Sequence, residues 1–212
     1  MRVRRLVIAA LAVAAGASDA LAQKPRAEHL GARIQGTRGP HNAISDVAGV
    51  EVGHTTFISG SGGLVVGKGP VRSGATVVDA RGNAVQDPVF GAWFTLNGNG
   101  EMTGTTWLEE SGILEGPVAI TNTQSVGVVR DAILQWQVRR PGLQPWGLPV
   151  VAETYDGALN DINGFHVTAE HTIAALDGAS SGRVQEGSVR GGTGVGCFGF
   201  KGAIWTLLSG GG

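Results

Sequence analysis

Glycine is the feature that most limits what this chain can fold into. It accounts for 36 of the 212 residues, roughly 17% where about 7% is usual. The glycines show no Gly-X-Y period, so a collagen helix is excluded. Short apolar runs separate them, and hydrophobic residues make up 42% of the chain, which excludes a disordered polymer. The pattern predicts a globular domain with many turns and several close backbone approaches.

The charge and the cysteine content of the chain exclude two further classes, nucleic-acid-binding proteins and folds stabilised by internal disulfide bonds. The formal net charge is −1 and the pI is near 6.5, so the chain lacks the basic footprint of a nucleic-acid-binding protein. Cys197 is the only cysteine and cannot form an internal disulfide bond. The fold must therefore be stabilised by its hydrophobic core, and no nucleic-acid partner is expected.

The first 22 residues have the composition of a signal peptide. Arginine occupies three of the first five positions, residues 6–15 are apolar, and Ala20 and Ala22 are the small residues that a signal peptidase reads. A transmembrane anchor is the alternative, but the uncharged run 6–18 is too short to cross a bilayer core of ~30 Å. We therefore expect cleavage after Ala22 and a periplasmic or secreted mature protein with no membrane segment.

Apolar spacing predicts alternating strands and helices along the mature chain. The β-rich runs that predict strands are 50–57, 75–80, 117–121 and 148–154. Helical spacing of apolar residues predicts helices over 105–114, 126–138 and 168–176. The alternation indicates a mixed α and β domain.

Small polar residues gather after the predicted strands, where loops usually hold ligands. Turn formation alone explains most of the Asn, Asp and Gly residues there. It explains Glu101, Glu153 and Tyr155 less well, so these side chains are candidates for a binding or catalytic site. A zinc site has less support, because His166 and His171 are five positions apart and would point about 140° apart on a helix.

Five longer strings make the sequence similar to a known family. They are 42–53, 97–112 (NGNGEMTGTTWLEESG), 120–132 (ITNTQSVGVVRDA), 153–167 (ETYDGALNDINGFHV) and 191–202 (GGTGVGCFGFKG). With them the chain resembles the P1 (S58) peptidase family of self-processing aminopeptidases, which includes the L-aminopeptidase/D-esterase-amidases and the β-peptidyl aminopeptidases. The resemblance covers nearly the whole mature chain, and it is closest to the exported β-peptidyl members.

The resemblance implies an α+β fold, a four-layer αββα sandwich laid out like an N-terminal-nucleophile hydrolase with different chain connectivity. Family precursors cut themselves before a serine, and the freed serine amine activates that nucleophile. The implied reaction releases N-terminal amino acids, β- or D-amino acids among them, from peptides, amides or esters. No metal or organic cofactor is implied.

The matching strings also suggest site residues. Tyr155 would be catalytic, by positioning or polarising the reacting groups. Glu101 is the candidate to bind the free amine of the substrate, with Glu110 or Glu153 as alternatives, and Asn122 is a further candidate substrate-binding residue. The resemblance does not choose between α-, β- and D-amino-acid substrates.

The chain departs from the family after residue 202. Residues 203–212 replace the family's oxyanion asparagine and cleavage serine, and Ser209 is internal, so it has no free amine to activate it. Residues 23–202 are therefore expected to be the α-chain part of a peptidase domain, an incomplete sandwich that is inactive alone. Expected partners are the missing β chain, a peptide or aminoacyl substrate and further copies in a homo-oligomer. The alternative is a non-catalytic small-molecule binding or scaffolding protein that retains part of the fold.

Overall fold

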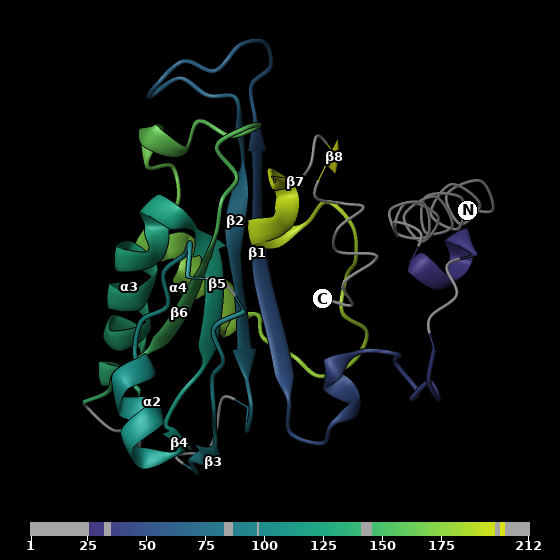
Figure 1. Ribbon diagram of the computed structural model, residues 1–212, viewed down its shortest axis with the longest axis vertical. Helices are drawn as coiled ribbons and strands as arrows, with labels where there is room; N and C mark the ends of the chain where they lie inside the picture. The colour runs from purple at the N-terminus through teal and green to yellow at the C-terminus, as the bar shows by residue number, and fades with distance from the viewer. Residues whose placement is uncertain are drawn as a thin grey trace, which may run out of the picture. The chain divides into compact units, whose positions relative to one another are not determined.

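The computed structural model describes most of the chain between residues 26 and 201 (Figure 1). The described ranges are 26–31, 35–82, 87–96, 98–140, 146–197 and 200–201. Residues 1–34 and 35–212 form two compact units, and the first contributes the short 3-10 helix η1, Ala27–Leu30. The predicted signal peptide (1–22) and the divergent tail (203–212) lie outside the described residues. The sheet, its helices and the candidate site all belong to the second unit.

A four-stranded mixed sheet forms the centre of this unit, in the order β1-β2-β5-β6. The strands are β1 (Glu51–Ser59), β2 (Val71–Asp79), β5 (Val118–Asn122) and β6 (Val150–Thr154). β2 pairs antiparallel with β1 and with β5, whereas β5 and β6 are parallel. The carboxyl ends of β1, β5 and β6 therefore lie together at one end of the sheet, beside the start of β2.

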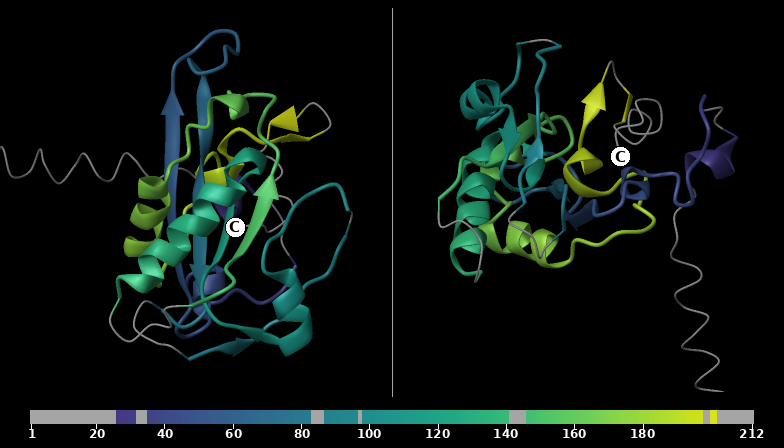
Figure 2. Two further views of the ribbon diagram at one scale, coloured as in Figure 1. Left: turned by 90° about the vertical axis from the view of Figure 1, so that its left-hand side faces the viewer. Right: turned by 90° about the horizontal axis from the view of Figure 1, so that it is seen from below.

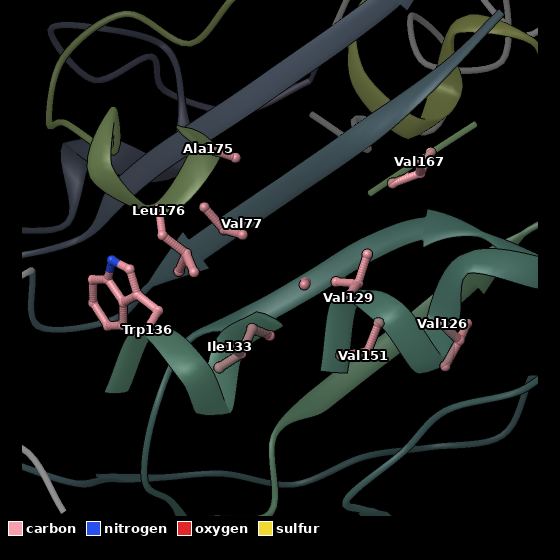
Figure 3. Packing of buried hydrophobic residues seen from close by; sticks show 10 residues of the cluster. Val77, Val126, Val129, Ile133, Trp136, Val151, Val167, Ala175 and Leu176 are labelled. Atoms are coloured by element: carbon pink, nitrogen blue, oxygen red, sulfur yellow. The ribbon is translucent and has the colours of Figure 1, made fainter. Parts of the chain in front are cut away.

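Two helices cover one face of the sheet (Figures 1 and 2). α3 (Val126–Val138) packs against β5 and β6, and α4 (Ala169–Asp177) packs against β1, β2 and α3. Figure 3 shows their apolar side chains directed toward Val77 and Val151 of the strands. Ile133 and Leu176 are fully buried there, and each such side chain stabilises the fold by about 1.5–3 kcal/mol.

The contact between α4 and β1 depends on a glycine. A Cβ atom at Gly53 would lie 1.9 Å from the carbonyl oxygen of Ala175 in α4, so the helix rests directly on the strand backbone. Further along β1, the hydroxyl of Thr55 donates to the carbonyl oxygen of His171 (3.0 Å). The contact at Gly53 is one of the close backbone approaches that the glycine content predicts.

A smaller helix lies at the opposite end of the sheet from the carboxyl ends of β5 and β6. α2 spans Thr105–Ser111 and ends at Gly112, whose φ of 66° is left-handed. The chain then continues into β4 (Ile113–Leu114), which pairs with β3 (Val89–Phe90). The predicted helix 105–114 is therefore too long, because the glycine stops it.

The remaining elements are short. They are the 3-10 helices η2 (Ile44–Asp46), η3 (Thr123–Ser125), η4 (Ile162–Gly164) and η5 (Arg190–Thr193), and the hairpin of β7 (Gly196–Cys197) and β8 (Phe200–Lys201). Among the described residues, no helix combines the length and the apolar character needed to cross a membrane.

The second face of the sheet is only partly covered by described residues. Side chains alternate along a strand, so Ile58 and Ile120 point away from the helices, and they are 51% and 36% exposed. η5 packs against β1, β2 and β5, on the side away from α3 and α4 (Figure 1). The predicted α+β class is confirmed, with one sheet layer and one helix layer in the described residues.

Candidate active site

The candidate residues gather at the carboxyl ends of β5 and β6. Asn122, the last residue of β5, is in register with Thr154, the last residue of β6. Tyr155 follows directly, and η3 begins directly after Asn122. Because the two strands are parallel, side chains that are thirty residues apart in sequence meet at this edge.

Glu101 and Glu153 lie side by side along β6. The backbone N–H of Glu153 donates to the carbonyl oxygen of Glu101 (3.1 Å), and Met102 forms a bridge to Ala152. The Glu153 carboxylate accepts a hydrogen bond from the Thr123 hydroxyl (2.5 Å), whereas the Glu101 side chain is exposed. Glu153 is thus held in place, and Glu101 is open to a ligand.

Glu110, the other carboxylate that the sequence suggests, lies elsewhere. It belongs to α2, which follows Gly104 along the chain. A Cβ atom at Gly104 would lie 2.6 Å from the Leu148 carbonyl oxygen and 2.9 Å from that of Pro149. The start of α2 is therefore fixed at the amino end of β6, away from Tyr155. Of the three glutamates, the structure brings Glu101 and Glu153 together and separates Glu110 from them.

Asn122 is a buried support of the site, with only 2% of its surface exposed. Its Oδ1 atom accepts from the backbone N–H of Ser125 (3.1 Å) and caps η3. Its Nδ2 atom donates to the hydroxyl of Ser73 on β2 (2.9 Å). Both ends of the amide are used internally, so the position favours holding the strand ends over direct contact with a substrate.

Tyr155 presents its ring at the surface. It is 60% exposed, and it is the only tyrosine of the chain. A Cβ atom at Gly157 would lie 2.6 Å from the Tyr155 hydroxyl oxygen, so the ring lies against the Gly157 backbone. The hydroxyl is thereby held at the rim of the site, where it can donate to or accept from a bound molecule.

Asp156 and Asn160, in the segment that directly follows Tyr155, form a buried polar pair where the sequence alone indicates turn residues. Asp156 is fully buried, and the Asn160 amide donates to its Oδ1 atom (2.9 Å). Burial raises the pKa of the Asp156 carboxyl to about 6, and hydrogen bonding by Ser73 and Asn160 offsets part of the rise. A strand end followed by Asp and Asn is too common a turn pattern to reveal such burial from sequence.

Asp161 ties the long hairpin loop between β1 and β2 to the same end of the sheet. Its Oδ2 atom accepts from the backbone N–H groups of Gly67 (2.7 Å) and Gly69 (3.2 Å). It also pairs with His166 Nε2 (2.8 Å). The hydrogen bond from His166 is the main cause that lowers the pKa of Asp161. No group of three or more His, Cys, Asp or Glu side chains among the described residues could hold a metal ion.

Comparison with known proteins decides the family. The family model described as Peptidase family S58 matches residues 42–206. The chain belongs to peptidase family S58. Among curated relatives, the beta-peptidyl aminopeptidase BapA of Sphingosinicella microcystinivorans is 56% identical over 202 residues, which are 94% of this chain and 50% of the relative. BapA of Sphingosinicella xenopeptidilytica is 47% identical over 203 residues, again 94% of this chain and 50% of the relative.

Solved structures of S58 relatives share the fold. One is the L-aminopeptidase D-Ala-esterase/amidase of Ochrobactrum anthropi, which is described as a variant of the Ntn hydrolase fold. It matches with a TM-score of 0.75 and 46% identity, over 84% of this chain and 51% of its own length. The beta-aminopeptidase of a Burkholderia species matches with a TM-score of 0.74 and 48% identity. This match covers 84% of this chain and 50% of the Burkholderia chain. The chain spans about half the length of the relatives that it matches.

Proposed function

We propose that this chain is the α-chain part of an exported serine aminopeptidase, which releases N-terminal amino acids from peptides, amides or esters. Membership of peptidase family S58 and 56% identity to a beta-peptidyl aminopeptidase support the reaction class. The observation that carries the proposal for this chain is that Glu101 pairs with Glu153 near the carboxyl end of β6 and that Tyr155 directly follows this strand. Because both curated relatives are beta-peptidyl aminopeptidases, β-aminoacyl compounds are the first substrates to test.

The exposed side chains of Glu101 and Tyr155 would have different roles in the reaction. The cationic amine at the N-terminus of a substrate attracts a carboxylate, and charge-assisted hydrogen bonds are the strong ones. Glu101 is exposed beside β6 and would bind this amine, while Thr123 keeps Glu153 in a fixed position next to it. The Tyr155 hydroxyl would hydrogen-bond the reacting group as charge develops on it.

A second chain segment would supply the nucleophilic serine. The chain spans about half of its relatives, and one face of its sheet leaves Ile58 and Ile120 partly exposed. Apolar surface in water favours association. We propose that the β chain of the complete protein covers this face, adds the second sheet and completes the site, and that complete copies assemble into a homo-oligomer.

Glu101 is tested by a matched pair of substitutions in the complete enzyme, made by joining this chain to the second half of a relative. Glu101→Gln removes the charge and is expected to raise KM and lower kcat/KM about 10- to 100-fold, as for loss of one charged hydrogen bond. Glu110→Gln, the same change at the far end of β6, should leave both constants unchanged. Equal effects of the two substitutions would contradict the assignment.

Tyr155→Phe tests the second role. The substitution keeps the ring and removes the hydroxyl, so kcat is expected to fall roughly 10²–10³-fold with an unchanged thermal midpoint. Trp146→Phe, at an exposed aromatic residue near the amino end of β6, is the control. Unchanged turnover of an aminoacyl p-nitroanilide by Tyr155→Phe would show that the hydroxyl takes no part.

Export is tested separately. The basic start, the short apolar run and Ala20 and Ala22 lead us to propose that the mature N-terminus is Gln23. Expression in a bacterium should give a periplasmic product, and N-terminal sequencing should read from Gln23. Recovery of only an intact Met1 form in the cytoplasm would contradict the proposal.

A further inference from the structure

The carboxyl group of Asp156 lies in the protein interior, where ionisation costs free energy. Its side chain is fully buried, and its Oδ2 atom has no well-formed hydrogen bond with any residue that the structure describes. Its Oδ1 atom accepts one, from the Asn160 amide. An ionised carboxylate can accept about four hydrogen bonds, so this one is poorly satisfied. The roles proposed for Glu101 and Tyr155 make no use of this group.

The carboxyl group lies where three strand ends meet. Asn160 links it to β2, because Asn160 Oδ1 accepts from the backbone N–H of Arg72 (2.9 Å). Ser73 on β2 lies close enough to the carboxyl group of Asp156 to lower its pKa, and its hydroxyl accepts from Asn122 at the end of β5. Asp156 itself comes two residues after the end of β6. A change in the bonding of this carboxyl group therefore reaches β2, β5 and β6.

We propose that Asp156 is a positioning residue of the candidate active site, and that gain or loss of a proton on its buried carboxyl group changes the orientation of Tyr155. Its importance for catalysis rests on the proposed function, in which Tyr155 contacts the reacting group. The response of Tyr155 to the proton is a property of this chain by itself.

The proton reverses one hydrogen bond. An ionised carboxylate only accepts, so the Ser73 hydroxyl must donate to it. A protonated carboxyl group has an O–H that donates, and the Ser73 oxygen can then accept. The Ser73 oxygen also accepts from the Asn122 amide, so in the protonated state it accepts from two donors. Because burial raises the pKa of Asp156 to about 6, the reversal occurs close to neutral pH.

The charged side chains that the structure describes around this junction have other partners. The Arg72 guanidinium donates to three backbone carbonyls at the base of the hairpin loop. Asp161 pairs with His166, and Glu153 accepts from a threonine hydroxyl. Gly194, the residue directly after η5, packs against Asp156 and is uncharged. None of these described groups is placed to hold the buried carboxyl in its ionised form.

The experiment uses the chain's single tyrosine as a reporter. A chain grown with 3-fluorotyrosine carries its fluorine only at Tyr155, next to Asp156. We expect its fluorine NMR signal to shift with pH with a midpoint near 6. Asp156→Asn cannot ionise and abolishes this inflection, whereas Asp131→Asn, the same change on the exposed surface of α3, keeps it. An inflection that survives Asp156→Asn overturns the proposal.

Two further variants make the result decisive. Histidines also titrate near this pH, so His166→Gln must keep the inflection, and its loss there overturns the proposal. If Asp156→Asn does not fold, Ser73→Ala decides. Removing that hydroxyl removes a bond that lowers the carboxyl pKa, so the midpoint should rise by about half a unit to one unit. An unmoved midpoint overturns the proposal, and no readout requires catalysis, so failure of the aminopeptidase proposal is seen separately.

Discussion

Replacement of Gly53 by alanine tests whether α4 rests directly on the backbone of β1. The added Cβ atom would lie 1.9 Å from the carbonyl oxygen of Ala175 and 2.9 Å from the amide nitrogen of Ala179. Both are backbone atoms, so no side-chain rotation relieves the overlap and the helix must move away from the sheet. Overpacking of this kind costs about 1–3 kcal/mol, a large part of a total stability of about 5–15 kcal/mol.

The assay is chemical denaturation. The control is a matched substitution with the opposite expected effect on the free energy of unfolding. Gly127→Ala adds the same methyl group near the start of α3, where nothing lies within 4 Å of the new atom. Alanine is favoured over glycine in a helix by about 0.5–1 kcal/mol, and at the second helical residue we expect a gain at the low end of that range. A Gly53→Ala chain as stable as the parent would refute the close packing of α4 on β1.

Three other substitutions or conditions give separate tests. The pKa of Asp156 is raised in the folded chain from 3.8 to about 6, so the folded state binds the proton more tightly. Lowering the pH from 8 to 5 should therefore increase the free energy of unfolding of the parent by about 1.4 kcal/mol relative to Asp156→Asn, and an equal change in the two chains would contradict this. Trp136→Phe removes the indole hydrogen bond to Asp177 (2.8 Å). That bond is the main cause that lowers the pKa of Asp177. Thermal melts should therefore show a stability difference between parent and variant that is largest at neutral pH and shrinks, down to the loss of core packing, as the pH falls below 3.8. Asp161→Ala frees the backbone N–H groups of the hairpin loop, and limited proteolysis should cut this loop faster than in the parent; equal rates would show that the carboxylate does not hold it.

The regular elements could be predicted where local pattern and tertiary contact agree. Apolar residues at helical spacing predict 126–138, and α3 has those bounds because the same residues face the sheet. β2 is different: the predicted strand began at 75, whereas β2 begins at Val71. Arg72 and Ser73 are not typical strand residues, and they are kept extended by pairing with β1 and by the hydrogen bond that the Arg72 N–H donates to Asn160 in the loop after β6. Tertiary contacts decide such positions, and a single sequence does not display them.

The residues of the candidate site also fall into those that the sequence could reveal and those that only the folded chain reveals. Glu101, Glu153 and Tyr155 could be selected because glutamate and tyrosine are unusual in turns, and the fold places them at one edge. Asp156 and Asn160 could not, since both are ordinary turn residues in sequence. Their importance comes from burial and from bonds to β2, which are properties of the folded chain.

The most direct test combines this chain with the second half of a relative. The segment of a beta-peptidyl aminopeptidase relative that lies outside the match would be co-expressed with residues 23–212, and the purified product assayed on β- and α-aminoacyl p-nitroanilides. We predict that the two chains co-purify in equal amounts and hydrolyse at least one of these substrates, and that each chain alone is inactive. Hydrolysis by residues 23–212 alone, or a well-formed complex with no activity, would contradict the central claim.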